Sequence, residues 1–384
     1  MKKLKQQLKA SRFIKYIYEF IFQRPIYNLF NKSHKKKMLF SYSTYHFNKS
    51  NYTSHSNYQE SKLIAKIFDS LEYQVDIINN DRPYDGNLAL YDVIFGEGIP
   101  MYQAVENKVS AVVIYYGTGS HPWHCTNSSL SRIVDFYNIH QVSALSSGRI
   151  SDYRWGLAAS MADSVICIGN EKTKKTFIEN GSKIVLPLDP TFIPRSDSIS
   201  ILNEKNMNKA KKQALWFGSY GLLHKGLDLA IEAFREKPEW TLHVCGYTAA
   251  EANLLSTINP SSNVHIHGFV DVLSESFKEI AIECGFVILP SCSEGTATAV
   301  ITAVGNGSMI PIVTAECGFD IDDFGFNIEL NKLSIIDTMN AIDKTPEATL
   351  YHMAKNANSV VRERYTLSNF ENTIQSHIRK LLMY

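Results

Sequence analysis

Residues 285–300 read GFVILPSCSEGTATAV, an apolar run followed by a polar loop and a stretch of small and branched residues. The run at 285–290 is short, apolar and ended by Pro290, which is typical of a buried β-strand. A helix is expected after it, at about 296–305. Because a strand followed by a helix is the repeating unit of a parallel sheet, the segment predicts an α/β fold.

The same alternation extends along the chain in both directions from this segment. In the second half, strands are expected at 214–218, 240–245, 264–269 and 309–314, and helices at about 225–236, 249–258, 274–284 and 333–343. In the first half, strands are expected at 37–43, 74–79, 91–96, 110–116, 163–169 and 183–188, with helical stretches such as 58–72 between them. The pattern predicts two doubly wound, Rossmann-like domains, in which ligands bind beyond the carboxyl ends of the strands.

The predicted domains divide the chain into five segments. Between the two domains the apolar pattern stops and residues such as Pro194, Ser196 and Ser198 gather, which is typical of a linker. The segments are a basic amphipathic extension at 1–36, a first domain at 37–190, a linker at 191–212, a second domain at 213–365 and a C-terminal helix at 366–384. One option for the last helix is that it packs back on the first domain.

Composition excludes several classes of protein. Hydrophobic residues make up 45% and charged residues 20% of the 384 residues, which is enough for two cores and rules out a disordered chain. No run of 18 or more apolar residues predicts a membrane-spanning helix. The six cysteines lie far apart without a CxxC pair, so we expect reduced thiols in a cytosolic protein.

The net charge of +1 conceals a strongly basic N-terminus. Residues 1–37 hold eleven lysines and arginines and one acid, Glu19, whereas the rest of the chain holds 28 basic and 37 acidic residues. Apolar and aromatic residues recur at roughly helical spacing among these charges, which favours a helix lying on an anionic membrane surface. Packing on the first domain is the alternative, and a nucleic-acid arm is not favoured because no nucleic-acid-binding fold follows. Lys9 and Arg12 interrupt any signal-peptide core.

A glycine-containing loop with a lysine near its end follows the strand predicted at 214–218. It reads GSYGLLHKGLD over residues 218–228 and places Lys225 at or just before a helix N-terminus. The helix dipole disfavours a cation there, and a bound anion would remove the conflict because helix N-termini with glycine-rich approaches hold phosphates. A solvated lysine at a frayed helix end is the alternative.

The loop after the strand at 285–290 has a similar character. A helix starts after Gly295, so the backbone amides of residues 295–298 are expected to be free for an anion. The alternative is a capping box, in which Glu294 bonds back to the amide of Ser291. Two such helix starts on adjacent strands favour an anion site.

These motifs resemble those of the retaining nucleotide-sugar glycosyltransferases of the GT-B fold, the group 1 type that includes bacterial cell-surface polysaccharide enzymes. The resemblance rests on KGLD at 225–228, HGFV at 267–270 and PSCSEG at 290–295, and covers about 214–318. It implies that Lys225 contacts the donor diphosphate and that Glu294 contacts the transferred sugar. The implied nucleotide and diphosphate site further includes Gly218, Ser219, Gly268, Phe269, Val270, Gly295, Thr296, Ala297, Thr298 and Thr302.

The sequence departs from the family pattern at three places. Thr302 stands where the family has a second glutamate that holds the ribose, and Ser219 stands where it has a basic residue. His224 is one candidate for the missing donor. The loop at 41–57 lacks the glycines that the family places near the phosphates. These departures keep open a second hypothesis, a non-catalytic relative that binds a sugar nucleotide or serves as a partner subunit.

The acceptor side is expected in the first domain. The strand at 110–116 is followed by GTGSHPWHC, and a histidine there resembles the family residue that reaches the donor sugar. His121 is the first choice and His124 the second. Glu97, after the strand at 91–96, is a candidate for acceptor binding or a solvated turn residue. Closely spaced loop positions give poor ligand geometry, so no metal site is expected.

The resemblance implies a metal-independent hexosyltransferase-like enzyme that uses a nucleotide-diphosphate sugar as substrate and needs no cofactor. The expected acceptor is a membrane-associated glycan or lipid, and retention of configuration is implied. Residues 1–36 and the cysteines lead us to expect a cytoplasmic protein, peripheral at the inner face of the cell membrane. A solute-binding protein of two similar domains is a third reading, which the absence of a signal peptide disfavours.

Overall fold

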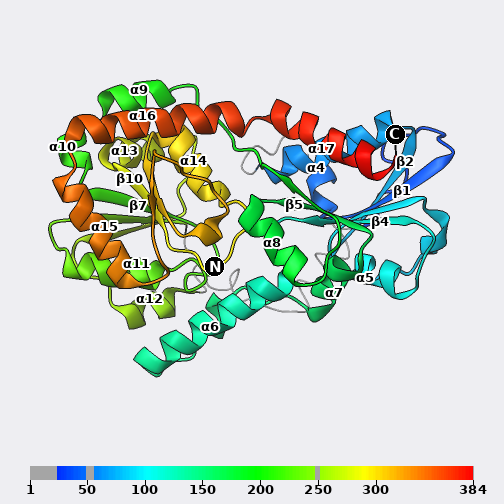
Figure 1. Ribbon diagram of the computed structural model, residues 1–384, viewed down its shortest axis with the longest axis horizontal. Helices are drawn as coiled ribbons and strands as arrows, with labels where there is room; N and C mark the ends of the chain where they lie inside the picture. The colour runs from blue at the N-terminus through cyan, green and yellow to red at the C-terminus, as the bar shows by residue number, and fades with distance from the viewer. Residues whose placement is uncertain (1–23, 49–55, 247–250, 384) are drawn as a thin grey trace, which may run out of the picture.

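The computed structural model describes residues 24–48, 56–246 and 251–383. It contains two α/β domains side by side, each built on a six-stranded sheet (Figure 1). The strands of the first sheet are β1 (Lys36–Ser41), β2 (Tyr73–Ile78), β3 (Val93–Gly96), β4 (Val112–Gly117), β5 (Ser164–Ile168) and β6 (Val185–Leu188). Those of the second are β7 (Gln213–Phe217), β8 (Thr241–Cys245), β9 (Val264–Gly268), β10 (Phe286–Leu289), β11 (Ile310–Val313) and β12 (Phe326–Asn327).

Both sheets are parallel throughout. Their strand orders are β2-β1-β3-β4-β5-β6 and β12-β11-β10-β7-β8-β9. In each sheet the strand order reverses beside the first strand of the domain, where doubly wound folds bind ligands. The prediction of two doubly wound domains is therefore confirmed.

Helices cover both sheets. In the first half they are α3 (Tyr45–Asn48), α4 (Asn57–Ser70), α5 (Ile99–Glu106), α6 (Pro122–His140), α7 (Tyr153–Met161) and α8 (Glu171–Glu179). In the second half they are α9 (Ser198–Glu204), α10 (Met207–Ala210), α11 (Leu227–Glu236), α12 (Ala252–Ile258), α13 (Glu275–Glu283), α14 (Thr298–Gly307), α15 (Lys332–Lys344), α16 (Glu347–Arg364) and α17 (Leu367–Leu381).

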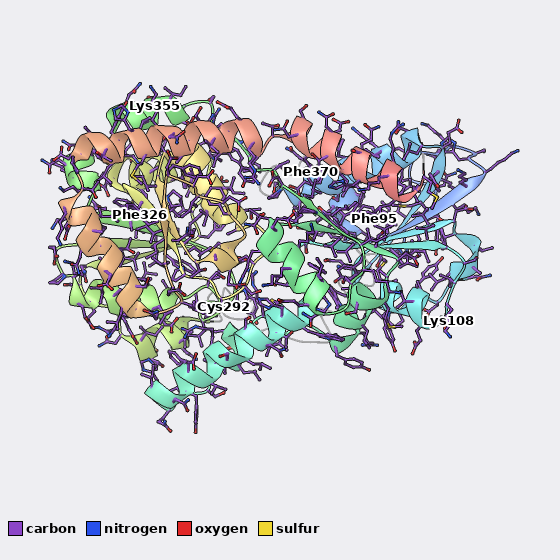
Figure 2. The ribbon with its side chains drawn as sticks, viewed as in Figure 1. Phe95, Lys108, Cys292, Phe326, Lys355 and Phe370 are labelled. Atoms are coloured by element: carbon purple, nitrogen blue, oxygen red, sulfur yellow. The ribbon has the colours of Figure 1, made fainter. Side chains whose placement is uncertain are left out.

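The first sheet is buried on both faces. Because side chains alternate along a strand, Met38 and Phe40 of β1 enter the core on one face and Leu39 enters the core on the other. Helix α17, at the end of the chain, completes the first of these cores. Phe370 of α17 shares that core with Phe95 of β3 (Figure 2), so the chain returns to the first domain after it has built the second.

The segment between the domains is more ordered than its sequence indicated. Two short helices, α9 and α10, occupy much of 191–212, and Ile201 and Met207 are buried in the core of the second domain. The sequence did not predict these helices because the apolar residues in this polar segment are few and widely spaced. Part of the predicted linker therefore packs as second-domain structure.

Helix α6 begins in the first domain and runs along the second (Figure 1). Phe136, in its last turns, is 1% exposed and belongs to the core of the second domain. Arg132 on the same helix forms a buried ion pair with Asp228 of α11, with a nitrogen–oxygen distance of 2.5 Å. Helix α6 is therefore a strap that holds the two domains together.

The basic extension lies mostly outside the described residues. Residues 1–23, which carry the predicted amphipathic helix, are not described. The part that is described pairs with the first sheet through a bridge between Ile26 and Ile77. In the described ranges, no helix combines the length and hydropathy needed to cross a membrane.

Candidate functional site

A cavity of about 440 Å³ lies between the two domains. The loops after β7 and β10 of the second domain form one wall, and residues of the first domain form the other. From the second domain the lining residues include Gly218, Ser219, Lys225, Glu294, Thr296, Ala297, Thr298 and Ala299. From the first domain they include Tyr42, Asn57, Glu60, Thr118 and Arg149. The cavity therefore lies beyond the carboxyl ends of the strands, as expected for this kind of fold.

Lys225 is fixed in the wall of the cavity. Its amide donates to the carbonyl of Gly221 at 2.9 Å, and its carbonyl accepts from the indole nitrogen of Trp216 at 3.2 Å. The next residue, Gly226, is the N-cap of α11 with a φ of 63°, where a Cβ atom would lie only 2.1 Å from the carbonyl oxygen of Pro290. Glycine is thus required, and it sets Lys225 directly before the helix.

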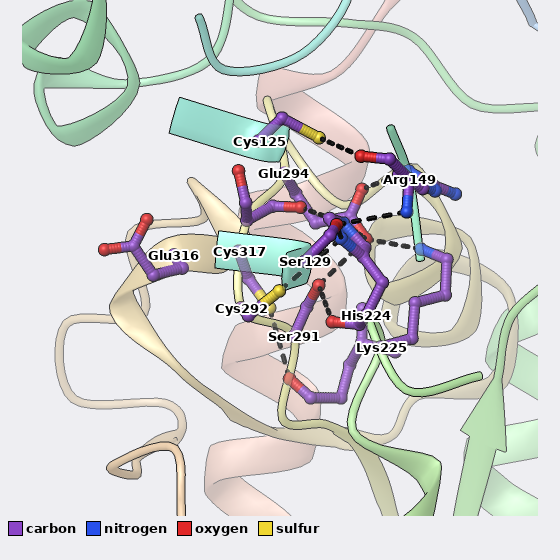
Figure 3. A network of polar contacts seen from close by, with 12 residues as sticks. Cys125, Ser129, Arg149, His224, Lys225, Ser291, Cys292, Glu294, Glu316 and Cys317 are labelled. Carbon is purple, nitrogen blue, oxygen red and sulfur yellow. Dashed lines mark hydrogen bonds and ion pairs between the residues drawn. The ribbon is translucent and has the colours of Figure 1, made fainter. Parts of the chain in front are cut away.

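Lys225 is 5% exposed, and its ammonium group pairs with Oε1 of Glu294 (Figure 3). The alternative of a solvated lysine at a frayed end is wrong. Ser291 Oγ also donates to Oε1 of Glu294 at 3.1 Å. The lysine and the glutamate lie in the loops that follow the adjacent strands β7 and β10, so the topology brings the two motifs together.

Glu294 accepts from both domains. Arg149 of the first domain donates to Oε2 of Glu294 at 3.2 Å. Burial by itself would raise the pKa of Glu294, but Lys225 and then Arg149 lower it by more, so the carboxyl pKa lies well below its ordinary range. Glu294 is consequently an anion across the physiological pH range.

The start of α14 rules out one sequence alternative and restricts the other. The helix begins at Thr298 with Ala297 as N-cap and no side-chain cap, so the capping box of Ser291 and Glu294 does not form. The amide of Ala297 donates to the carbonyl of Cys317 at 2.8 Å and is not available for a ligand. The amides of Thr298 and Ala299 begin the helix and have no intrahelical acceptor. Of the four amides predicted to be free for an anion, the one at Ala297 is therefore occupied, whereas the one at Thr298 lies at the uncapped start of the helix.

Two further features mark the loop before α14. Thr296 is 6% exposed, and its hydroxyl has no hydrogen-bond partner within the described part of the chain. Gly295 meets the first domain so closely that a Cβ atom would lie 2.4 Å from the carbonyl oxygen of Ile168. Thr173 of the first domain donates to the carbonyl of Gly295 at 3.0 Å. The loop after β10 is therefore held by both domains.

His224 is a buried bridge between the domains. Its Nδ1 lies 2.8 Å from Ser129 Oγ, and its Nε2 lies 2.5 Å from the carbonyl oxygen of Ser293. The carbonyl oxygen of Ser293 can only accept, so His224 carries its proton on Nε2, and Ser129 Oγ, which accepts from the amide of Arg149, donates to Nδ1. Burial lowers the pKa of His224 to about 4. A neutral imidazole with both nitrogens engaged does not replace a missing cation.

The two histidines expected on the acceptor side occupy different places. His121 is fully buried; its Nδ1 accepts from the amide of Trp123 at 3.2 Å, and its Nε2 lies 3.1 Å from Ser160 Oγ. Burial lowers its pKa to about 4. His124 reaches the second domain, where its Nε2 lies 3.1 Å from Oε2 of Glu316. Neither histidine lines the cavity, and His121 is the N-cap of α6.

Glu97 lies behind the cavity wall. It is buried and accepts from Thr118 Oγ1 at 3.1 Å and from the side-chain amide of Asn80 at 3.0 Å. Burial raises the pKa of Glu97 to about 7, against the opposing effect of the hydrogen bond from Thr118. Because Thr118 itself lines the cavity, Glu97 contacts the lining through one hydroxyl. It is not the solvated turn residue that was the alternative.

Three of the residues expected near the nucleotide also line the cavity. Phe269, Val270 and Thr302 line it, and Phe269 is 81% exposed. Gly268 is the last residue of β9 and has a φ of 74°, and its carbonyl accepts from the amide of Gly246 at 2.6 Å. An exposed aromatic ring beside an apolar lining suits a flat base.

Arg149 is the site residue that sequence reasoning missed. It lies between the short 3-10 helix Leu145–Ser147 and α7, far from the motifs in the chain. A lone arginine in a loop carries no motif, so the sequence contained no signal for it.

In the described ranges, no group of three or more histidine, cysteine or acidic residues is arranged to hold a metal ion.

Comparison with known proteins places these motifs in a recognised domain. Residues 199–320 match the family model described as "Glycosyl transferases group 1". The match covers about a third of the chain and includes the loops of Lys225 and Glu294. No curated protein matches the chain in sequence. The match supports a glycosyltransferase domain in the second half.

Solved structures share the fold of the whole chain. HepE of Anabaena, crystallised with UDP and glucose, has a TM-score of 0.56 at 14% identity and covers 90% of this chain and 100% of its own. Sucrose-phosphate synthase of Thermosynechococcus elongatus has a TM-score of 0.62 at 13% identity, covering 91% and 100%. WaaG, a glycosyltransferase of lipopolysaccharide biosynthesis, has a TM-score of 0.51 at 14% identity, covering 89% and 99%. These likenesses establish the GT-B fold.

Proposed function

We propose that the protein transfers a sugar from a nucleotide-diphosphate donor to a hydroxyl group of a glycan or lipid acceptor. The observation that carries the proposal is the pairing of Lys225 with Glu294 in the wall of an interdomain cavity, beside the uncapped start of α14. Lys225 and the helix start suit an anion, and Glu294 suits a polar group attached to that anion. The family match over 199–320 supports it.

Lys225 and the amides of Thr298 and Ala299 would bind the diphosphate. Charge develops on this group as the bond to the sugar breaks, and preorganised donors in a buried site stabilise that charge. Lys225 is already buried and its backbone is fixed by hydrogen bonds, so only its ammonium group has to exchange Glu294 for the diphosphate when the donor binds. When the diphosphate takes over Lys225, Glu294 is released to accept hydrogen bonds from the sugar hydroxyls.

Glu294 is not suited to act as an acid or a nucleophile. Its low pKa keeps it unprotonated, so it cannot act as an acid. Its ion pairs with Arg149 and Lys225 reduce its strength as a nucleophile. A double displacement would further need a partner carboxylate at a fixed separation from it. We propose retention without a protein nucleophile, in which the departing phosphate accepts the proton of the acceptor hydroxyl, and no divalent metal ion takes part.

The partners follow from the same architecture. HepE binds UDP and UDP-glucose, which makes UDP the first probe for this chain. The basic residues 1–36 would hold the protein at an anionic membrane, on the cytoplasmic face, where a lipid-linked or membrane-associated glycan is presented. The proposed role is in bacterial cell-surface polysaccharide synthesis.

The first test is nucleotide binding. Thermal unfolding is measured with UDP, GDP, ADP and CMP, for the unaltered protein and for Lys225→Ala. At least one nucleoside diphosphate should raise the melting temperature of the unaltered protein, and the shift should be lost in the variant. Lys332→Ala is the matched control, because Lys332 forms an exposed ion pair on the same domain.

The second test is turnover of the sugar nucleotide. Lys225→Ala should lose at least ~10²-fold in transfer or donor-hydrolysis rate, the scale for removing one preorganised donor. An unchanged rate would reject the role of Lys225. Thr302 in the cavity favours one other candidate, a non-catalytic sugar-nucleotide binder; binding without any hydrolysis or transfer would select that function.

A further inference from the structure

The loop after β7 lacks a positive charge at position 219. Ser219 is exposed and lines the cavity, next to Gly218 and close to Lys225. Among the described residues that line the cavity, the basic ones are Lys225 and Arg149. A diphosphate carries more charge than one lysine neutralises, so the second cation decides how tightly it can be held.

Arg149 occupies the space beside this loop from the opposite domain. Its Nη2 lies 3.4 Å from the carbonyl oxygen of Tyr220, and a Cβ atom built at Gly221 would lie 3.5 Å from its Nε. Its Nη1 contacts Glu294, the partner of Lys225. The side chain is 34% exposed, so a ligand in the cavity can reach it. Arg149 and Lys225 both contact Glu294 (Figure 3).

The backbone of Arg149 is held by the strap α6. Its amide donates to Ser129 Oγ at 3.0 Å, and its carbonyl accepts from Cys125 Sγ at 3.8 Å. Ser129 also bonds His224, which is adjacent to Lys225 in the chain. The two cations are thus tied to one another through a buried hydrogen-bonded chain as well as through Glu294.

We propose that Arg149 is the second cation of the diphosphate site, contributed by the first domain in place of a basic residue at position 219. This inference rests on the proposed function and adds a residue to it. A planar guanidinium binds two phosphate oxygens at once, which a lysine does not. Because Lys225 and Arg149 lie on different domains, the complete site exists only when the domains are closed.

The rival role for Arg149 is to pair with Glu294 and nothing more. Ligands that carry one phosphate or two phosphates distinguish the two roles. A purely structural arginine would affect a nucleoside monophosphate and a diphosphate alike. An arginine that binds the diphosphate changes the ratio of the two affinities.

The experiment measures dissociation constants by calorimetry for UDP and UMP, GDP and GMP, and ADP and AMP. The pair with the tightest diphosphate is carried forward. The proteins are the unaltered chain, Arg149→Gln, Arg149→Lys, Ser219→Arg combined with Arg149→Gln, and Lys225→Ala. Arg154→Gln is the control, since Arg154 lies nearby on α7 and pairs with Asp152 at the surface.

Arg149→Gln should weaken diphosphate binding about 10- to 100-fold, the range for a lost charge-assisted hydrogen bond, and monophosphate binding by much less. Arg149→Lys should recover part of the loss, and Ser219→Arg should recover most of it by restoring the charge from the other domain. Arg154→Gln should bind as the unaltered chain does.

Equal losses for diphosphate and monophosphate in Arg149→Gln, or no loss, would overturn the inference. The proposed function would still stand if Lys225→Ala lost diphosphate affinity in the same series. If no nucleoside diphosphate bound the unaltered chain, the inference and the proposed function would both be overturned.

Discussion

At the scale of single residues, the site is a balance of buried charges. Glu294 stays ionised because Lys225 and Arg149 offset the cost of burying it. Glu97 lies in the opposite situation, since its neighbours Thr118 and Asn80 offer hydrogen bonds but no positive charge. Two carboxyl groups near one cavity therefore have pKa values on opposite sides of their ordinary range.

Glu97 makes the stability of the protein depend on pH. Its pKa is about 7 in the folded protein against 4.5 ordinarily, so the folded state binds its proton more tightly than the unfolded state. Glu97 therefore costs stability as the pH rises from about 4.5 to about 7. The free energy of unfolding of Glu97→Gln, relative to that of the unaltered protein, should rise between about pH 5 and about pH 8, by at most about 3 kcal/mol.

The measurement is the free energy of unfolding by urea at a series of pH values. Glu106→Gln is the control, because Glu106 is exposed in the same domain. A difference between Glu97→Gln and the unaltered protein that stayed constant with pH would contradict the assignment.

At the scale of elements, the strap α6 connects the two domains through packing and charge. Phe136 is buried in the second core, and Arg132 pairs with Asp228 at the start of α11, the helix that follows Lys225. An ion pair shielded from water is costly to break by removing one partner, because the other charge is left unpaired.

Arg132→Ala or Asp228→Ala should each lower the free energy of unfolding by about 3–5 kcal/mol. Replacing both together by Met and Leu should cost clearly less, because no lone charge remains. Urea unfolding monitored by tryptophan fluorescence measures the difference. Lys175→Ala, in an exposed pair with Glu179, should change little; a double variant as unstable as the single variants would count against a buried ion pair.

Sequence reasoning succeeded where local pattern decides the structure. The strands expected at 214–218 and 285–290 are β7 and β10, and Lys225 and Glu294 follow them because a parallel sheet gathers its loops at one edge. It missed α9 and α10, whose apolar residues are sparse, and it placed the start of α14 too early. The place of Arg149 in the site could not be predicted from the sequence, since packing between the domains decides its position.

At the scale of the whole molecule, the chain crosses between the domains more than once. The strap α6 reaches the second domain, and α16 and α17 lead from it back to the first (Figure 1). These crossings and the contacts at Gly295 hold the cavity between two surfaces. Closure, donor binding and the pairing of Arg149 are therefore expected to be coupled.

We expect residues 1–23 to attach the whole molecule to a membrane. These residues hold five lysines and one arginine against Glu19, so a chain that begins at residue 24 should no longer sediment with anionic vesicles. This deletion keeps Ile26, which pairs with β2. Neutral vesicles are the control. Equal sedimentation of both chains with anionic vesicles would remove the proposed membrane role.

The most direct measurement is a crystal structure of the protein with the nucleoside diphosphate that binds it best. We expect phosphate oxygens within ~3 Å of Lys225 Nζ and of the amides of Thr298 and Ala299, with Glu294 turned toward the place of the sugar. A diphosphate bound elsewhere, with Lys225 still paired to Glu294, would contradict it.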